Sequence, residues 1–382
     1  MPSKSSIQVQ IIRQWSECKA LRNEWNRLAQ MRSMHSFEWH DAWWNHYAGQ
    51  LSSPLSLFVL RISEGESTRA LVPLCRSRSA LFGTQLEWMG GRKVCTDDNS
   101  ILLDPQASPQ VLQEIASTLA QLGREGEWDR LAWDGIATND PVMQALNQYL
   151  TSSGVPILSI AGPNCWSVEL PKQWELYLQS LSKRARRLLR QQNQMYVATG
   201  RATLIEPKST SEIEEALTYL RELHQHRWEE KNIEGCFSDQ GFGAFLRSVC
   251  FEMAASERLY LRLLKIDGEM AAGAVGFWDD DRLNLYLVGM EPRLEEHRPG
   301  WTLNVFTIQS AIERGVKHLD FLRGDEPYKA RLGASPRSQC RWVAAAPRSL
   351  PRLRHMAYQA GSWLKKRWPQ TSSQPTEIAS PE

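Results

Sequence analysis

The pattern of apolar positions is most regular between residues 282 and 333, where its period changes twice. Residues 283–288 place a leucine at every second position, which is typical of a strand. Apolar residues then recur at helical spacing from Pro299 to Gly315, a glycine suited to the end of a helix. Residues 316–322 return to a strand-like pattern. This order predicts a β-α-β crossover unit.

Both halves of the chain alternate between helical and strand-like patterns, which indicates a mixed α/β (α+β) fold. In the first half, the patterns predict helices at 15–29, 36–47, 109–122 and 141–150, and strands at 7–12, 55–62, 69–76, 100–103, 128–133 and 155–160. In the second half, they predict strands at 165–170, 201–206, 259–266 and 270–278, and helices at 172–199, 211–230 and 242–255. Ser209, Thr210 or Ser211 would cap the helix 211–230, and Ser211 and Glu214 have the spacing of a capping box. Asp267 and Gly268 predict a hairpin turn.

The turn-rich segment 161–164 separates the halves and is the predicted domain boundary. We predict a first domain over residues 1–162 and a second over 163–345. Residues 347–368 hold six cations and no acid among large apolar residues, so we predict a basic amphipathic helix over 346–369. This helix would lie on an anionic membrane surface or dock on the body of the protein. Residues 370–382 have the composition of a disordered tail.

Composition narrows the class of protein. With 382 residues, 42% of them hydrophobic, the chain is long enough for two globular cores. A net charge of +2 selects no class of partner. No apolar run approaches the roughly 18 residues of a transmembrane helix, and the N-terminal segment lacks the apolar region of a signal peptide. The seven cysteines are scattered without a C-x-x-C, so we expect reduced thiols in a cytoplasmic protein and no metal site.

A candidate anion site lies at the start of the predicted helix that begins at Pro299. Backbone N–H groups at a helix start have no partner within the helix, and the helix dipole adds partial positive charge beside them. Arg298 adds a fixed charge next to Gly300. The turn suits a phosphate or pyrophosphate. A purely structural turn is the alternative, since a single glycine at a helix start is common.

A second cluster of reactive side chains follows the strand 316–322. Its members are Arg323, Asp325, Glu326, Tyr328 and Lys329, with Gly324 and Pro327 between them. Loops after crossover strands often carry the chemistry of α/β proteins. A solvated charged turn is the alternative.

Segment 170–345 resembles a known family through the motifs RPGWTL at 298–303 and LDFLRGDEPYKARLG at 319–333. They are similar to the CelD-like acetyltransferase domain of the GNAT superfamily, which is related to the Fem aminoacyltransferases of peptidoglycan synthesis. The D-F-x-x-G-D-x-x-Y-K pattern carries most of the likeness, whereas the RPG turn has fewer glycines than the usual GNAT pyrophosphate loop. The resemblance implies tandem GNAT-like (acyl-CoA N-acyltransferase) domains, with a mixed sheet flanked by helices.

The resemblance also implies an N-acyltransferase. Such an enzyme would move an acetyl or longer acyl group from acyl-CoA to an amine acceptor, a small molecule or a cell-envelope precursor of polysaccharide metabolism. Backbone groups of Leu287, Val288 and Gly289 would face the thioester carbonyl. The pyrophosphate would be held by Arg298, Gly300, Trp301 and Thr302.

The remaining roles concern the acceptor and its proton. Asp325 or Glu326 would be the base, and Tyr328 would protonate the departing thiolate. Arg323 and Lys329 would hold an acidic acceptor, unless they form salt bridges within their loop. Further acceptor contacts implied by the resemblance come from Arg227, Trp228 and Tyr286.

The predicted helix 172–199 has one strongly cationic face. Its cations are Lys183, Arg184, Arg186, Arg187 and Arg190. Because like charges at this spacing repel one another, we expect an acidic neighbour or a polyanionic ligand. The ligand alternatives are the 3′-phosphate of CoA, an acceptor and RNA, and the structural alternative is a solvated helix face.

Two further functions stay open. One is a Fem-like transferase that takes its acyl group from aminoacyl-tRNA, which the cationic helix favours. The other is a non-catalytic accessory protein of exopolysaccharide synthesis, which the glycine-poor turn and the basic C-terminal segment favour.

Overall fold

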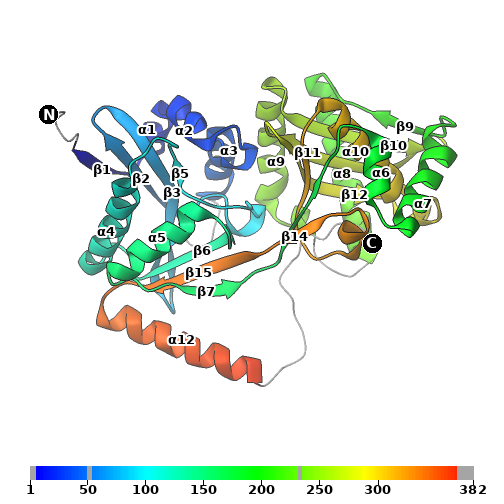
Figure 1. Cartoon of the computed structure of the whole chain (residues 1–382). Helices are drawn as coiled ribbons and strands as arrows, with labels where there is room; N and C mark the ends of the chain where they lie inside the picture. The colour runs from blue at the N-terminus through cyan, green and yellow to red at the C-terminus, as the bar shows by residue number, and fades with distance from the viewer. Residues whose placement is uncertain (1–5, 50–53, 231–234, 368–382) are drawn as a thin grey trace. The chain divides into compact units, whose positions relative to one another are not determined.

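The computed structural model describes residues 6–49, 54–230 and 235–367. The chain divides into two compact units (Figure 1). Within the described residues, unit 1 comprises the chain up to Gly162 together with 338–367, and unit 2 comprises Pro163–Arg337. The predicted tail 370–382 lies outside the described residues.

Unit 1 is built on one mixed sheet. Its strands are ordered β1 (Ile7–Ile12), β2 (Ser56–Glu64), β3 (Ser67–Ser79), β4 (Gly83–Trp88), β6 (Arg130–Ala137), β15 (Gln339–Ala345) and β7 (Leu158–Ala161), and β5 (Leu102–Leu103) pairs with β3. Neighbouring strands are antiparallel except β4 and β6, which are parallel. The helices are α1 (Trp15–Ala20), α2 (Arg22–Ala29), α3 (Phe37–Tyr47), α4 (Pro109–Glu125), α5 (Pro141–Ser152) and α12 (Ser349–Arg367).

Strand β15 differs from the predicted domain division. It follows unit 2 in the chain, and the sequence prediction placed it in a second domain that ends at residue 345. In the structure it pairs with β6 on one side and with the edge strand β7 on the other, so it belongs to the unit 1 sheet. Strand pairing between distant segments leaves no local signal, because the pattern of β15 fits either sheet.

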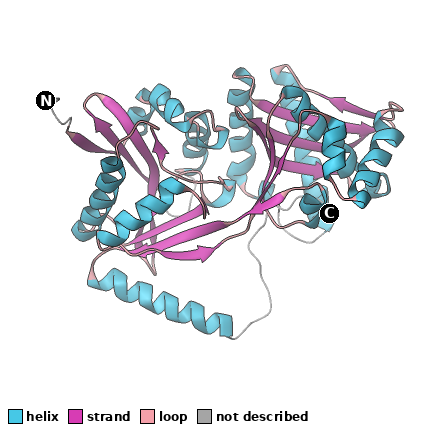
Figure 2. Ribbon diagram, in the orientation of Figure 1, coloured by secondary structure: helices cyan, strands magenta, loops and turns pink. Residues whose placement is uncertain are grey.

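Unit 2 is built on a second mixed sheet. Its strands are ordered β14 (Ser335–Arg337), β8 (Cys165–Glu169), β13 (His318–Arg323), β12 (Arg282–Met290), β11 (Glu269–Trp278), β10 (Leu259–Ile266) and β9 (Ala202–Ile205). The helices are α6 (Trp174–Ser180), α7 (Lys183–Gln192), α8 (Thr210–Glu230), α9 (Gln240–Ala255), α10 (Pro299–Arg314) and α11 (Pro327–Arg331). Figure 2 shows helices flanking the strands of each unit.

The two units repeat one order of elements. In unit 1 the antiparallel strands β2, β3 and β4 lead through α4 to the parallel strand β6. In unit 2 the antiparallel strands β10, β11 and β12 lead through α10 to the parallel strand β13. The structure thus confirms the predicted mixed α/β fold and the β-α-β crossover.

Glycine and alanine on β11 show how helices cover the two faces of the unit 2 sheet. A Cβ atom on Gly273 would lie 3.2 Å from the side chain of Leu220, which belongs to α8. The neighbouring Ala272 and Ala274 belong to the hydrophobic core that also contains Leu303 of α10. Because neighbouring side chains of a strand point to opposite faces, α8 covers one face and α10 the other.

Several predicted helices begin or end elsewhere. The predicted helix 172–199 is interrupted at Leu181, which is extended, and restarts where the Ser182 hydroxyl accepts a hydrogen bond from the Ala185 N–H. A serine that caps a new helix competes with continuation of the old one. The capping box of α8 pairs Ser209 with Glu212, not Ser211 with Glu214 as predicted. The predicted helix 15–29 is divided at Leu21 into α1 and α2.

Candidate functional site

Strands β12 and β13 diverge soon after they begin. They pair in parallel only at three positions, from Arg282 with His318 to Asn284 with Asp320. Beyond Asn284, β12 continues along β11 to Met290, while β13 continues along β8. The side of β12 that faced β13 is therefore left without a neighbouring strand within the described part of unit 2.

The backbone of β12 turns alternate groups toward that open side. The Glu291 N–H, just after the strand, donates to the Ala271 carbonyl on the β11 side (2.9 Å). Since N–H groups two residues apart point the same way, Gly289 and Leu287 also face β11, and Val288 faces the open side. Of the three backbone groups predicted to meet an acyl carbonyl, this geometry favours Val288.

Gly289 has a different, packing role. A Cβ atom there would lie 2.9 Å from the backbone nitrogen of His224 and 3.1 Å from the carbonyl carbon of Leu223, both in α8. No side chain fits at this distance from backbone atoms. Glycine therefore allows α8 to pack directly against the end of β12.

The start of α10 offers fewer backbone donors than the sequence suggested. Arg298 is the N-cap residue, in the left-handed region (φ 51°), and Pro299 has no N–H. The N–H groups of Trp301 and Thr302 both donate to the Arg298 carbonyl (3.0 and 3.4 Å). In the first turn of α10, the Gly300 N–H is therefore the backbone donor that comes before the first hydrogen bond within the helix.

Helix α7 supplies a second helix start, and its charge is unusual. The first turn holds no acid, although carboxylates are favoured at the positive end of a helix dipole. It holds Lys183, Arg184 and Arg186 instead, with Arg187 next along the helix. This clustering of positive charge opposes helix formation and is relieved by an anion.

The two helix starts line one cavity of about 720 Å³, which we call the α7–α10 cavity. Its lining includes Ser182, Arg184, Arg187 and Leu188 around α7, Met290 and Glu291 at the end of β12, Arg298, Gly300 and Trp301 at the start of α10, and Tyr328 and Arg331 of α11. A volume of this size is typical of a site for a small molecule or cofactor.

The arginines of α7 fall into two groups. Arg190 pairs with Glu175 (3.2 Å), and Arg186 donates to the backbone carbonyls of Gln179 (3.1 Å) and Leu181 (3.0 Å). Arg184 and Arg187 line the α7–α10 cavity and make no ion pair with the residues that the structure describes. The acidic neighbour that we expected is therefore present for Arg190, as Glu175. The charges of Arg184 and Arg187 face the cavity, where an anionic ligand would neutralise them.

Glu291 is a candidate that the sequence patterns did not single out. It is buried directly after the end of β12, and its carboxylate accepts hydrogen bonds from the Arg293 backbone N–H (3.3 Å) and side chain (2.9 Å). His226 Nδ1 of α8 lies 3.3 Å from its other oxygen. Burial alone would raise the pKa of Glu291, but the hydrogen bonds from Arg293 and His226 lower it below its ordinary value. The only signal in the sequence is an acid directly after a strand.

The loop 323–329 is mainly a folded turn, and Lys329 shows why. Its side chain is fully buried, where Nζ donates to the carbonyls of Leu322 (3.2 Å), Arg323 (2.9 Å) and Gly324 (3.0 Å). The same nitrogen lies 2.8 Å from the Glu326 carboxylate. Lys329 thus holds the loop together, in place of its predicted contact with an acceptor.

The other members of the D-F-x-x-G-D-x-x-Y-K motif also serve this loop. Asp320 is buried and accepts from the Leu322 N–H (2.9 Å), which fixes Leu322 in the left-handed region (φ 55°). Gly324 has φ 112°, a conformation that favours glycine. The motif therefore encodes a strained strand-to-helix turn that leads into α11.

Neither predicted base is in the cavity. Asp325 accepts hydrogen bonds from Asn164 Nδ2 and Trp166 Nε1 (both 2.9 Å). Burial alone would raise the pKa of Asp325, but these hydrogen bonds lower it. Glu326 is paired with Lys329, and neither acid is among the described residues that line the α7–α10 cavity. The structure therefore places both acids in the support of the turn.

Tyr328 is the one predicted catalytic side chain that lines the cavity. It is buried, and its ring meets that of Phe321 edge-on (5.9 Å between centroids). The buried turn places it there, since α11 begins directly after the loop. Of the predicted cofactor residues, Arg298, Gly300 and Trp301 also line the cavity.

The remaining predicted residues lie elsewhere. Thr302 is buried and donates to Gln192 Oε1 (2.8 Å), a bond that joins α10 to α7. Tyr286 packs on Phe242 of α9 and on Phe277, on the sheet face opposite α10. Arg323 is half-buried at the end of β13. Arg227 and Trp228 belong to the last part of α8, and their side chains lie outside the described residues.

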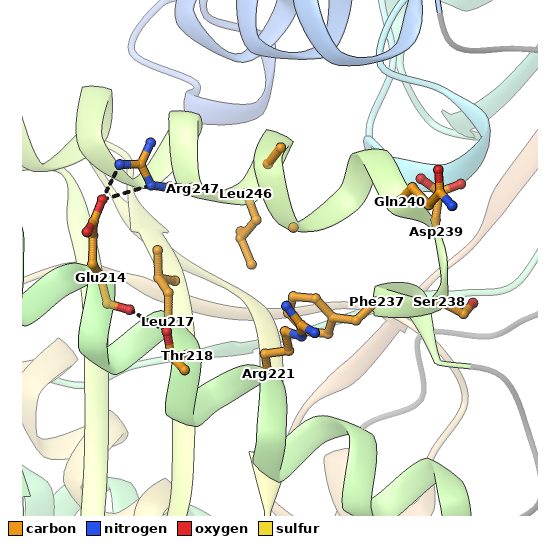
Figure 3. Close-up of a pocket in the computed structure, with 12 residues that line it drawn as sticks. Glu214, Leu217, Thr218, Arg221, Phe237, Ser238, Asp239, Gln240, Leu246 and Arg247 are labelled. Atoms are coloured by element: carbon orange, nitrogen blue, oxygen red, sulfur yellow. Dashed lines mark hydrogen bonds and ion pairs between the residues drawn. The ribbon is translucent and has the colours of Figure 1, made fainter.

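A second cavity, of about 570 Å³, lies between α8 and α9. Figure 3 shows Phe237 between the two helices and the ion pair of Glu214 with Arg247 that crosses from one helix to the other. The hydrogen bond of Asp239 to the Gly241 N–H caps α9 at this cavity (3.0 Å). Its lining holds the arginines Arg221 and Arg247 together with the acids Glu214 and Asp239, and Arg247 is already paired with Glu214.

Within the described ranges, no group of three or more His, Cys, Asp or Glu side chains is placed to hold a metal ion. No helix in those ranges is long and apolar enough to span a bilayer. The seven cysteines form no disulfide with one another.

Comparison with known proteins supports the predicted resemblance of unit 2 to GNAT acetyltransferases. Residues 179–330 match the family model described as the acetyltransferase (GNAT) domain. This match covers α7, β12, α10 and all of α11 except Arg331, the elements that line the α7–α10 cavity, and confirms the resemblance to GNAT acetyltransferases. No curated protein matches the chain.

Three solved structures show the same fold over most of the chain. A crystal structure of FemX is 9% identical, with a TM-score of 0.64, and the match covers 92% of this chain and 99% of that one. A C-terminal domain (DUF2156) assigned to a lysylphosphatidylglycerol synthetase of Agrobacterium fabrum is 13% identical, with a TM-score of 0.53 and coverages of 91% and 97%. A conserved protein of unknown function from Bacteroides thetaiotaomicron is 11% identical, with a TM-score of 0.52 and coverages of 89% and 100%.

Proposed function

We propose that unit 2 is an N-acyltransferase that binds an acyl-CoA in the α7–α10 cavity and transfers its acyl group to an amine. One observation carries the proposal. The two helix starts and the cations Arg184, Arg187 and Arg298 converge on the same cavity that receives the open end of β12. The cations and the Gly300 N–H suit a pyrophosphate, and the open strand suits the thioester.

The reaction follows from these positions. The amine nitrogen attacks the thioester carbonyl, a C–N bond forms, and the developing oxyanion is stabilised by the Val288 N–H. The C–S bond then breaks and the thiolate leaves. Glu291, held ionised by Arg293 and His226, accepts the proton that the amine loses. Tyr328 protonates the thiolate and recovers its proton from Glu291, so that the products are an amide and free CoA.

This assignment changes the base that the sequence suggested. Glu291 lines the cavity beside the open strand, while Asp325 and Glu326 support the loop before α11. The proposed acceptor is an amine of polysaccharide or cell-envelope metabolism, as the resemblance to CelD-like domains implies. The acyl group is acetyl or longer.

Acyl-CoA binding is tested by thermal unfolding of the full chain with acetyl-CoA and with longer acyl-CoAs. Ligand at a hundred times its Kd should stabilise the protein by about 2.7 kcal/mol and raise the Tm accordingly. Arg187→Ala should weaken binding by about tenfold or more, because it removes a charge-assisted contact. Gly300→Glu should abolish the shift by placing a carboxylate at the pyrophosphate site.

Arg190→Ala is the matched control. Arg190 lies on the same helix, but it pairs with Glu175 away from the cavity lining. The control should keep the Tm shift of the parent protein. Equal losses in the two arginine variants, or no shift with any CoA, would remove the support for a CoA site.

A second candidate is transfer from aminoacyl-tRNA, as in the Fem relatives. Arg184 and Arg187 support it, since unpaired guanidinium groups at a cavity rim suit an RNA phosphate as well. Salt-sensitive binding of tRNA in a gel-shift or anisotropy titration, with no response to CoA, would favour this donor. A non-catalytic accessory role is favoured instead if Glu291→Gln and Tyr328→Phe both leave cellular function intact.

A further inference from the structure

Helix α12 docks on unit 1 through one of its faces. Arg348 donates to the Asp129 carboxylate (2.6 Å) and to the Trp128 carbonyl (3.0 Å). Pro351, one turn along, is buried. The Arg130 guanidinium lies over the ring of Tyr358 (4.6 Å) and over that of Phe82 (3.8 Å). Figure 1 shows the helix alongside β15. The sequence predicted that this helix lies on a membrane surface or docks on the body of the protein, and the structure shows it docked on the protein.

The opposite face of α12 exposes apolar side chains. Leu350, Leu353 and Met356 are 57%, 58% and 55% exposed, and they recur every three residues on one side of the helix. The buried and half-buried positions Pro351, His355 and Tyr358 lie on the other side. A helix that packs on a protein usually turns a polar face to solvent. The solvent-facing side of α12 instead carries large apolar side chains.

The charge of the segment indicates what this face meets. Residues 347–368 contain six cations and no acid, although the whole chain has a net charge of only +2. Arg352 is exposed on the turn between Leu350 and Leu353. An anionic bilayer presents phosphate groups at its surface and acyl chains beneath them. Basic residues beside apolar side chains match this arrangement, because the basic residues contact the phosphates and the apolar side chains contact the acyl chains.

We propose that the outer face of α12, formed by Leu350, Leu353 and Met356 with the exposed Arg352, attaches the protein to the surface of an anionic membrane. The helix lies along the interface, with its inner face still held by Asp129 and Arg130. The three apolar side chains enter the headgroup region while Arg352 meets lipid phosphates, and Arg348 stays bound to Asp129. This inference does not rest on the acyltransferase activity.

A second copy of the chain fits this face less well. A stable dimer buries about 800 Å² on each partner, which three side chains do not supply. Two copies would also bring together two segments that each hold six cations and no acid of their own. Charge complementarity favours the lipid surface.

The test is cosedimentation of the full chain with vesicles of phosphatidylcholine alone and of phosphatidylcholine with phosphatidylglycerol. We expect partitioning onto the anionic vesicles at least about tenfold above the neutral ones, reduced at high salt. The double variant Leu353→Glu with Met356→Glu should lower it by about tenfold or more. Both positions are exposed, so the variant should keep the Tm of the parent protein.

Leu176→Glu is the control. Leu176 is 46% exposed on α6 of unit 2, outside the basic segment, and its substitution should leave vesicle binding unchanged. Equal binding to neutral and anionic vesicles, or none to either, overturns the proposal. A concentration-dependent dimer that the double variant abolishes also overturns it and assigns the face to a second copy of the chain.

Discussion

Replacing Glu291 by glutamine should lower kcat for acyl transfer by about 10²–10⁴-fold. The substitution keeps the size of the side chain and its ability to accept from Arg293, but an amide takes no proton from the amine. The KM for acyl-CoA should change little, because the proposed contacts to CoA come from α7 and α10. Steady-state kinetics with acetyl-CoA and a panel of amines measure both quantities.

Glu295 provides the matched control for this prediction. It also lines the α7–α10 cavity, but it is exposed on the segment Pro292–His297. Glu295→Gln should retain most of the activity. If Asp325→Asn abolishes the reaction in a folded protein while Glu291→Gln does not, the base belongs to the loop before α11, as the sequence motif suggested.

The pH dependence of Glu291 has a definite sign. Hydrogen bonds hold its pKa below the ordinary value of 4.5, so the carboxylate is ionised at neutral pH. The stability that these bonds contribute is fully present above pH 4.5 and is lost as the pH falls through the lower folded-state pKa. A loss of activity between pH 7 and pH 5 should then reflect protonation of the amine acceptor, and Glu291 should add its own loss only below that window.

The crossover unit was predictable because its signals are local. Alternating leucines mark β12, and Pro299 and Gly315 mark the two ends of α10. The cationic face of α7 also follows from helical spacing. These features depend on neighbours in the chain, which a sequence displays directly.

The composition of the cavity was only partly predictable. Arg298, Gly300, Trp301 and Tyr328 reach it from segments that the motifs marked. Glu291 reaches it because β12 and β13 diverge, and that divergence depends on the pairing of β13 with β8, which lies far back in the chain. The charges of the loop 323–329 suggested catalysis because a sequence does not show burial. The partners of Asp325, Asn164 and Trp166, come from a distant segment.

The largest effect on stability is expected at Lys329. Lys329→Met removes a buried ammonium that three carbonyls and one carboxylate share, and it takes from the half-buried Glu326 carboxylate the cation that pairs with it. Breaking a buried ion pair in this way costs about 3–5 kcal/mol. The free energy of unfolding from a urea titration should fall by that amount. Lys317→Met, at an exposed site just before β13, should change it by no more than about 0.5 kcal/mol.

The double variant Lys329→Met with Glu326→Gln separates the ion pair from the carbonyl contacts. Removing both charges should recover part of the lost stability, because no buried charge is left unpaired. The three carbonyls still lack their donor, so the recovery should be incomplete. If Lys329→Met costs less than about 1 kcal/mol and instead raises the KM for the acceptor, Lys329 contacts the acceptor as the sequence suggested. The buried geometry argues for the stability effect, because a fully enclosed ammonium cannot reach a substrate without unfolding the turn that it holds.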